Sequence, residues 1–168
     1  LSGGTLSAVD EDAVELLDTI MVSPMPEIEI DLSGYSTTAY GSLKIDFSGL
    51  TNASGNIDYY FTVKRSGQGS YDGSNAYYRE TLGNVGDFGT LCFGMQRARG
   101  TIILEEWGEN IEQAIYVSSW GQASGTTGAS SRGVTIMQNA GAITHIKLSN
   151  QFGVNFTGGL IRIYGYRK

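Results

Sequence analysis

The closing stretch of the chain, residues 142–168, constrains the fold more than any other part. It holds two runs in which apolar and polar side chains alternate, 142–150 and 158–168, joined by a loop rich in glycine and asparagine. Such alternation is typical of strands with one face on a core, and two consecutive runs predict antiparallel strands. Because the second run ends almost at the last residue, the chain finishes within a sheet whose other strands come from earlier in the sequence.

Further short runs of this kind occupy the chain before residue 142. The predicted strands are 27–32, 42–47, 57–65, 77–82, 89–95, 100–107, 112–120 and 132–137. The 24 glycines, against only 2 prolines, supply the tight turns between them. About ten short strands of this spacing predict an antiparallel sandwich or barrel, and strands with one apolar face favour a two-sheet sandwich over residues 27–168. The small polar residues of 121–131 predict a long loop, either a mobile rim loop or a contact with a partner.

Residues 1–26 are predicted to form a separate N-terminal arm with a short helix at about 8–20. Apolar residues recur there at i, i+4, i+7, i+8 and i+11, namely Val9, Ala13, Leu16, Leu17 and Ile20. The helix covers one end of its own sandwich, or the arm docks on a neighbouring subunit or upstream module; disorder is the third alternative. If the arm serves assembly, deleting residues 1–22 should abolish assembly and leave the sandwich folded.

The charge of the chain is negative, with a net charge of −6. Five acidic residues and no basic one lie in 1–26, which leaves 12 acids and 11 bases for the rest. Phosphate binding needs clustered Lys and Arg, so nucleic acid is not an expected partner. No apolar run is long enough for membrane insertion. Cys92 is the single cysteine, which excludes an intrachain disulfide and a cysteine-based zinc site, and no cofactor motif occurs.

The sequence offers no convincing catalytic or metal-binding set. His145 is the single histidine, and strand alternation places it outward. Glu105 and Glu106 are adjacent on a predicted strand and point to opposite faces, which disfavours a glycosidase pair. Asp72 begins a turn with several oxygen ligands but lacks the full calcium-loop pattern. We therefore predict no catalytic residue, no metal and no cofactor.

Aromatic side chains are the remaining indication of a binding surface. In the pairs Tyr59–Tyr60 and Tyr77–Tyr78, one ring must face away from the core if the strands are regular. Outward aromatics serve subunit contacts or saccharide stacking, and packing onto the chain's own loops is the alternative. The predicted binding residues are Tyr60, Tyr78, Trp107, Trp120, Tyr164 and Tyr166.

Several short motifs follow one another in a familiar order. The order is a strand, a Ser-Gly-Leu turn, a second strand, a Gly-rich hairpin and a Tyr-bearing strand, with an aliphatic–Tyr–Gly strand at the end. These motifs lie at 30–35, 43–53, 59–65, 66–73, 75–78, 143–148 and 155–165. This order resembles a module of virion proteins of tailed bacteriophages, especially tail-fibre and other surface structural proteins. The resemblance implies a jelly-roll-like sandwich without catalytic residues.

We therefore expect a non-enzymatic structural component of a bacteriophage virion, either a tail fibre or spike or a capsid decoration protein. It would be made in the host cytoplasm and pack in the virion against copies of itself, as a homotrimer by analogy, and against other virion proteins. Attachment to a host-surface glycan is a further expected role. The alternative is a carbohydrate-binding module that uses Trp107, Trp120 or paired tyrosines. A glycosidase acting through Glu105 or Glu106 is the third hypothesis.

Overall fold

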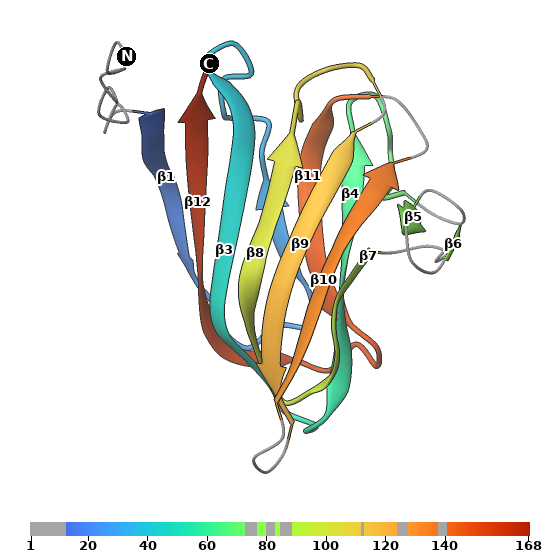
Figure 1. Ribbon diagram of the computed structural model, residues 1–168. Helices are drawn as coiled ribbons and strands as arrows, with labels where there is room; N and C mark the ends of the chain where they lie inside the picture. The colour runs from blue at the N-terminus through green and yellow to red at the C-terminus, as the bar shows by residue number, and fades with distance from the viewer. Residues whose placement is uncertain are drawn as a thin grey trace, which may run out of the picture.

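The computed structural model is all-β, with two antiparallel sheets (Figure 1). It describes residues 13–72, 77–79, 83–84, 89–111, 113–123, 128–137 and 141–168, and within 77–79, 83–84, 89–94 and 128–137 it describes the backbone alone. Over these residues there is no α-helix. Accordingly, the described chain holds no helix with the length and apolar character needed to cross a membrane.

The larger sheet has eight strands and the smaller has four. Hydrogen-bonded neighbours in the larger sheet are, in order, β1 (Val14–Met21), β12 (Phe156–Arg167), β3 (Tyr40–Asn52), β8 (Arg97–Glu105), β9 (Ala114–Gln122), β10 (Gly128–Met137), β5 (Tyr77–Arg79) and β6 (Gly83–Asn84). In the smaller sheet the order is β2 (Ile28–Asp31), β11 (Ile143–Asn150), β4 (Ile57–Arg65) and β7 (Gly89–Met95). The smaller sheet forms a second layer behind the larger one (Figure 1).

The core lies between the two layers, because alternate residues of the strands point inward from both sheets. Phe47 and Phe156 come from the larger sheet, Tyr59 and Phe61 from the smaller, and all four are almost completely buried. The rings of Tyr59 and Phe156 are 5.8 Å apart between centroids. Burying one such side chain contributes about 1.5–3 kcal/mol. The period-2 pattern in the sequence therefore predicted the buried face correctly.

The two closing strands exist as predicted but do not pair with each other. β11 pairs with β2 and β4 in the smaller sheet, and β12 pairs with β1 and β3 in the larger. Between them, the Asn150 side chain donates to the Val154 carbonyl at 2.7 Å and accepts from the Val154 amide at 3.0 Å. The connection thus crosses from one layer to the other, which alternation within each strand cannot reveal.

The predicted N-terminal helix is wrong from Val14 onward, because this segment forms β1 at the edge of the larger sheet. Its pairing with β12 shifts register between Leu16 and Asp18. The extra residue of this β-bulge lets Leu17 and Ile20, three positions apart, both pack against the core, whereas Leu16 faces solvent. A bulged strand therefore produced a spacing that resembles one face of a helix. Val9 lies outside the described residues.

The predicted rim loop at 121–131 is mostly strand. β9 continues to Gln122, and β10 begins at Gly128, which pairs directly with Gln122; residues 124–127 lie outside the described part. Small residues such as glycine and serine have low strand propensity, so sequence pattern alone does not predict them in a sheet. Here the neighbouring strand supplies the backbone hydrogen bonds that hold them extended.

Candidate functional site

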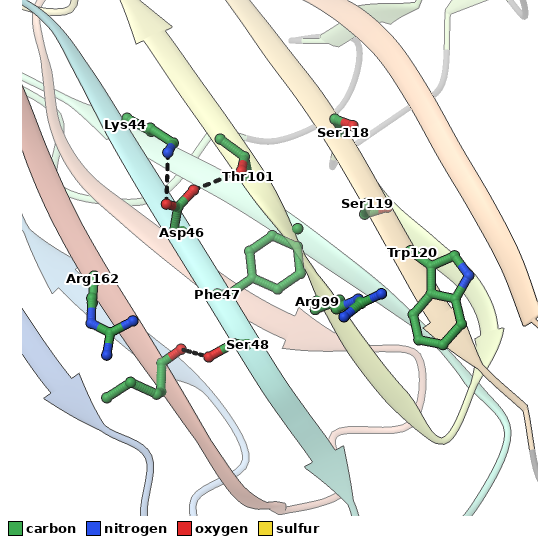
Figure 2. Close-up of a pocket in the computed structure, with 12 residues that line it drawn as sticks. Lys44, Asp46, Phe47, Ser48, Arg99, Thr101, Ser118, Ser119, Trp120 and Arg162 are labelled. Atoms are coloured by element: carbon green, nitrogen blue, oxygen red, sulfur yellow. Dashed lines mark hydrogen bonds and ion pairs between the residues drawn. The ribbon is translucent and has the colours of Figure 1, made fainter.

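The outer face of the larger sheet carries the candidate site, on the side away from the smaller sheet. Four neighbouring strands, β12, β3, β8 and β9, contribute to a shallow groove of about 530 Å³, named here the outer groove. The residues on which its chemistry depends are Lys44, Asp46, Arg99, Thr101, Trp120 and Arg162 (Figure 2). A second depression of about 700 Å³ continues it past Ser48, Arg99, Trp120 and Leu160, and adds Arg97 and Met21.

A β-bulge shapes the middle of the groove. Phe47 pairs with Gly100, but the next aligned pair is Leu50 with Ala98, so Ser48 and Gly49 together oppose a single residue. Gly49 has a φ of +62°, a left-handed conformation that glycine adopts without strain. The Ser-Gly-Leu sequence at 48–50, which the resemblance implied to be a turn, therefore lies within one continuous strand, β3.

Asp46 forms the polar centre of the groove. Its Oδ2 lies 2.7 Å from Lys44 Nζ, and its Oδ1 accepts a hydrogen bond from Thr101 Oγ1 at 2.6 Å (Figure 2). The hydrogen bond with Asp46 raises the pKa of Lys44, so the ammonium stays charged at physiological pH. Both carboxylate oxygens of Asp46 thus have partners on neighbouring positions of the sheet.

An arginine and a tryptophan stack beside this polar centre. The guanidinium carbon of Arg99 lies 4.5 Å from the centroid of the Trp120 ring (Figure 2). Arg99 and Trp120 are cross-strand partners on β8 and β9, which places their side chains on the same face. Trp120 is 40% exposed. The stack contributes about 0.5–1 kcal/mol at an exposed site and restrains the arginine.

The predicted aromatic residues are dispersed over the molecule. Trp120 lies in the groove, whereas Trp107 is only 2% exposed and belongs to the core. A buried ring offers no surface for a saccharide. The sequence-based prediction therefore grouped one exposed tryptophan with one buried tryptophan. Tyr60 is half-buried on the smaller sheet, where its hydroxyl donates to Asp58 Oδ2 at 3.2 Å. Tyr78 lies on β5, and its side chain is outside the described part.

The two C-terminal tyrosines lie together with part of the predicted assembly arm. Tyr164 pairs with Leu16 and Tyr166 pairs with Val14 across β12 and β1. Leu16 is 53% exposed and Val14 44%. The arm residue Ala13 directly precedes this strand. The structure thus places a partly exposed apolar row beside the groove at the β1 edge of the sheet.

Sequence reasoning missed the basic residues of the groove. Arg97, Arg99 and Arg162 come from β8 and β12, which are far apart in the chain and separated by β3 in the sheet. The sequence feature that could have identified these arginines was their outward position in each predicted strand. Which outward positions meet depends on strand order, and alternation does not encode that order.

Two of the other polar residues considered above, His145 and Asp72, lie beside other ionisable side chains. His145 Nε2 lies 3.7 Å from Asp31 and 3.9 Å from Glu29, both exposed carboxylates. Asp72 is buried and pairs with Arg65, so its carboxylate is not open to a cation. Among the described residues, no group of three or more His, Cys, Asp or Glu side chains is arranged to hold a metal ion.

A scan against protein-family models matches no family to this chain, and a search of curated proteins finds no significant match.

Proposed function

We propose that the protein is a non-enzymatic structural component of a bacteriophage virion, built as a jelly roll and displayed in a tail fibre or spike or as a capsid decoration. The observation that carries this proposal is the strand order. Eight strands, numbered 1 to 8 in chain order as β1, β2, β3, β4, β7, β8, β11 and β12, divide between the two sheets in the orders 1-8-3-6 and 2-7-4-5. Two intertwined Greek keys give this order, and jelly rolls recur in viral capsid and lectin domains.

The remaining strands widen one face of this arrangement. β9, β10, β5 and β6 extend the larger sheet beyond β8. A fold alone does not specify a function, so the virion role also rests on the motif order that resembles phage surface proteins. The row of exposed Val14 and Leu16 and half-buried Tyr164 and Tyr166 supports packing against a second copy, and we propose a homotrimer by analogy.

Immuno-electron microscopy tests the virion role. Antibodies raised against the purified chain should label intact particles of a phage that encodes it, at tail tips or over the head. Native mass spectrometry of the full chain should give three times the 18.0 kDa chain mass. Unlabelled particles, from infected cells that contain the protein, would show that it is not a virion component. A monomer mass would contradict the trimer but not the virion role.

A carbohydrate-binding module is the second proposal, because the outer groove combines an exposed indole with hydroxyl and cationic side chains. Trp120 is its aromatic residue, and Ser48, Thr101 and Ser118 add hydroxyls to the lining. Saccharide sites commonly join one aromatic surface to a few convergent polar groups. On a virion surface this activity is host attachment, so the two proposals are compatible. Saturable glycan binding that Trp120→Ala abolishes would support it.

A further inference from the structure

The outer groove has a charge opposite to that of the whole molecule. The chain carries a net charge of −6. In the described lining of the groove and its continuation, the basic side chains are Lys44, Arg97, Arg99 and Arg162 and the carboxylate is Asp46, a net charge of +3. A basic site in an acidic protein concentrates anions locally while the remaining surface repels them.

The charge of the arginines is not neutralised within the described structure. Asp46 is the carboxylate in the described lining, and it already engages Lys44 and Thr101 through its two oxygens. Arg162 is the cross-strand partner of Asp46, yet no ion pair joins them, and its guanidinium points away from Asp46 (Figure 2). Arg97 and Arg99 likewise form no ion pair with any described residue. Three guanidinium groups therefore remain available to an external anion.

Arg99 is held in place before any ligand binds. Its guanidinium stacks on Trp120, which restricts its rotamers and leaves the N–H groups at the edge of the plane free to donate. A side chain that is already ordered loses less conformational entropy on binding. A planar fork of donors matches a carboxylate or a sulfate, which it binds through two parallel hydrogen bonds.

The rest of the groove fits a sugar better than a bare ion. Ser48 and Ser118 supply neutral hydroxyls, and Met21 and Leu160 add apolar surface in the continuation of the groove. The volumes of about 530 and 700 Å³ fall within the range of about 300–1,000 Å³ that small-ligand sites have. Nucleic acid fits less well, because Asp46 lies in the groove and the net charge of the chain repels a polyphosphate.

We propose that the outer groove binds an acidic saccharide, one bearing a carboxylate or a sulfate. Arg99 and Arg162 bind the anionic group, with Arg97 at the continuation of the groove, and the sugar contacts the exposed edge of Trp120 and the serine hydroxyls. This inference rests on the proposed carbohydrate binding and specifies its ligand class.

The test uses the full chain on an array of neutral, carboxylated and sulfated oligosaccharides, followed by titration of the strongest ligand. Binding should concentrate on acidic members, and whether carboxylated or sulfated ones dominate identifies the anion. Arg99→Gln and Arg162→Gln should each raise the dissociation constant about tenfold or more, because a hydrogen bond to a charged group contributes about that factor to binding. Arg167→Gln, on the same strand as Arg162 but paired with Glu15, should change it less than about twofold.

Three glycan-binding results would overturn the proposal. These are binding of neutral glycans alone, no glycan binding at all, and equal losses in Arg162→Gln and Arg167→Gln. Tighter binding of a single-stranded oligonucleotide than of any acidic glycan would assign the groove to nucleic acid instead. A changed oligomer mass in the groove variants would assign the groove to contact between copies of the chain. Labelled virions without acidic-glycan binding would reject this inference alone, whereas acidic-glycan binding with unlabelled virions would reject only the virion role.

Discussion

Arg65 and Asp72 form an ion pair that is almost completely removed from water, with side chains 3% and 2% exposed. Gln68 also donates to Asp72 Oδ1, at 2.9 Å. Because removing one partner leaves the other charge buried, Asp72→Asn should lower the free energy of unfolding by about 3–5 kcal/mol. Urea denaturation measures this. Glu27→Gln breaks the more exposed 3.0 Å pair with Lys147 and should cost less than about 1 kcal/mol. Equal costs would contradict the role assigned to the buried pair.

The two tryptophans should respond differently to truncation. Trp107→Ala removes a buried ring and should cost about 3–5 kcal/mol, whereas Trp120→Ala should cost about 1 kcal/mol or less. Iodide quenching separates the two with the milder change to phenylalanine, which removes less of the buried ring than alanine does. Fluorescence of Trp107→Phe, which keeps Trp120, should be quenched, and that of Trp120→Phe should resist quenching. The reverse pattern would show that the burial assigned to these residues is wrong.

Gly100 should not tolerate a side chain. A Cβ at this position would lie 2.5 Å from the Ser118 carbonyl oxygen and 2.7 Å from Ser119 Cα, both backbone atoms of the neighbouring strand. Gly100→Ala should therefore lower the free energy of unfolding by about 1–3 kcal/mol. Gly34→Ala is the matched control, since nothing lies within 4 Å of its Cβ position. Thermal melting should leave the control unchanged, and an unchanged Gly100→Ala variant would contradict the strand spacing.

Two N-terminal truncations should distinguish the contribution of β1 to stability from that of the residues before it. Deleting residues 1–12 keeps all of β1, so the melting temperature should change little. Deleting residues 1–22 removes Leu17, Ile20 and Val22 from the core and exposes the edge of β12. The melting temperature should fall, and the exposed edge should promote association at high concentration. A folded, monodisperse 23–168 fragment would instead favour an arm separate from the sandwich, as the sequence predicts.

Alkaline pH should destabilise the protein partly through Tyr60. Burial, with a contribution from Asp58, raises the pKa of Tyr60 to about 12. The unfolded phenol has an ordinary pKa of about 10, so the folded state holds its proton more tightly. The stabilisation is complete below pH 10 and is lost as pH rises through 12. Urea denaturation at pH 9 and pH 11 should show a smaller loss for Tyr60→Phe than for the wild type. An identical loss would exclude this contribution.

Some errors of sequence interpretation share one physical origin, which is irregular strand geometry. The bulge near Leu17 gave β1 the apolar spacing of a helix, and the bulge at Gly49 made a continuous strand resemble a turn. A bulge adds one residue to a strand, so the alternation changes phase while the backbone pairing continues. Pattern analysis within one segment cannot separate that change from an end of the strand.

The candidate site was predictable only in part. Trp120 was predicted because aromatic residues on strands are candidates for stacking, but the same criterion also selected Trp107, which is buried. Arg99 and Arg162 gave no such signal. Outward arginines on strands are ordinary surface residues until the sheet places them beside a common groove.

By itself, the sequence determined that the described chain from residue 27 onward is all-β, where most of its strands lie, and which residues of the regular strands face the core. Those properties follow from local alternation, because each residue's side depends only on its own strand. The tertiary structure alone decided that β11 and β12 belong to different sheets, that β1 closes the edge beside β12, and that Arg99 and Arg162 line one groove. The physical reason is that strand order depends on which backbones exchange hydrogen bonds, and backbone groups are the same in every residue except proline.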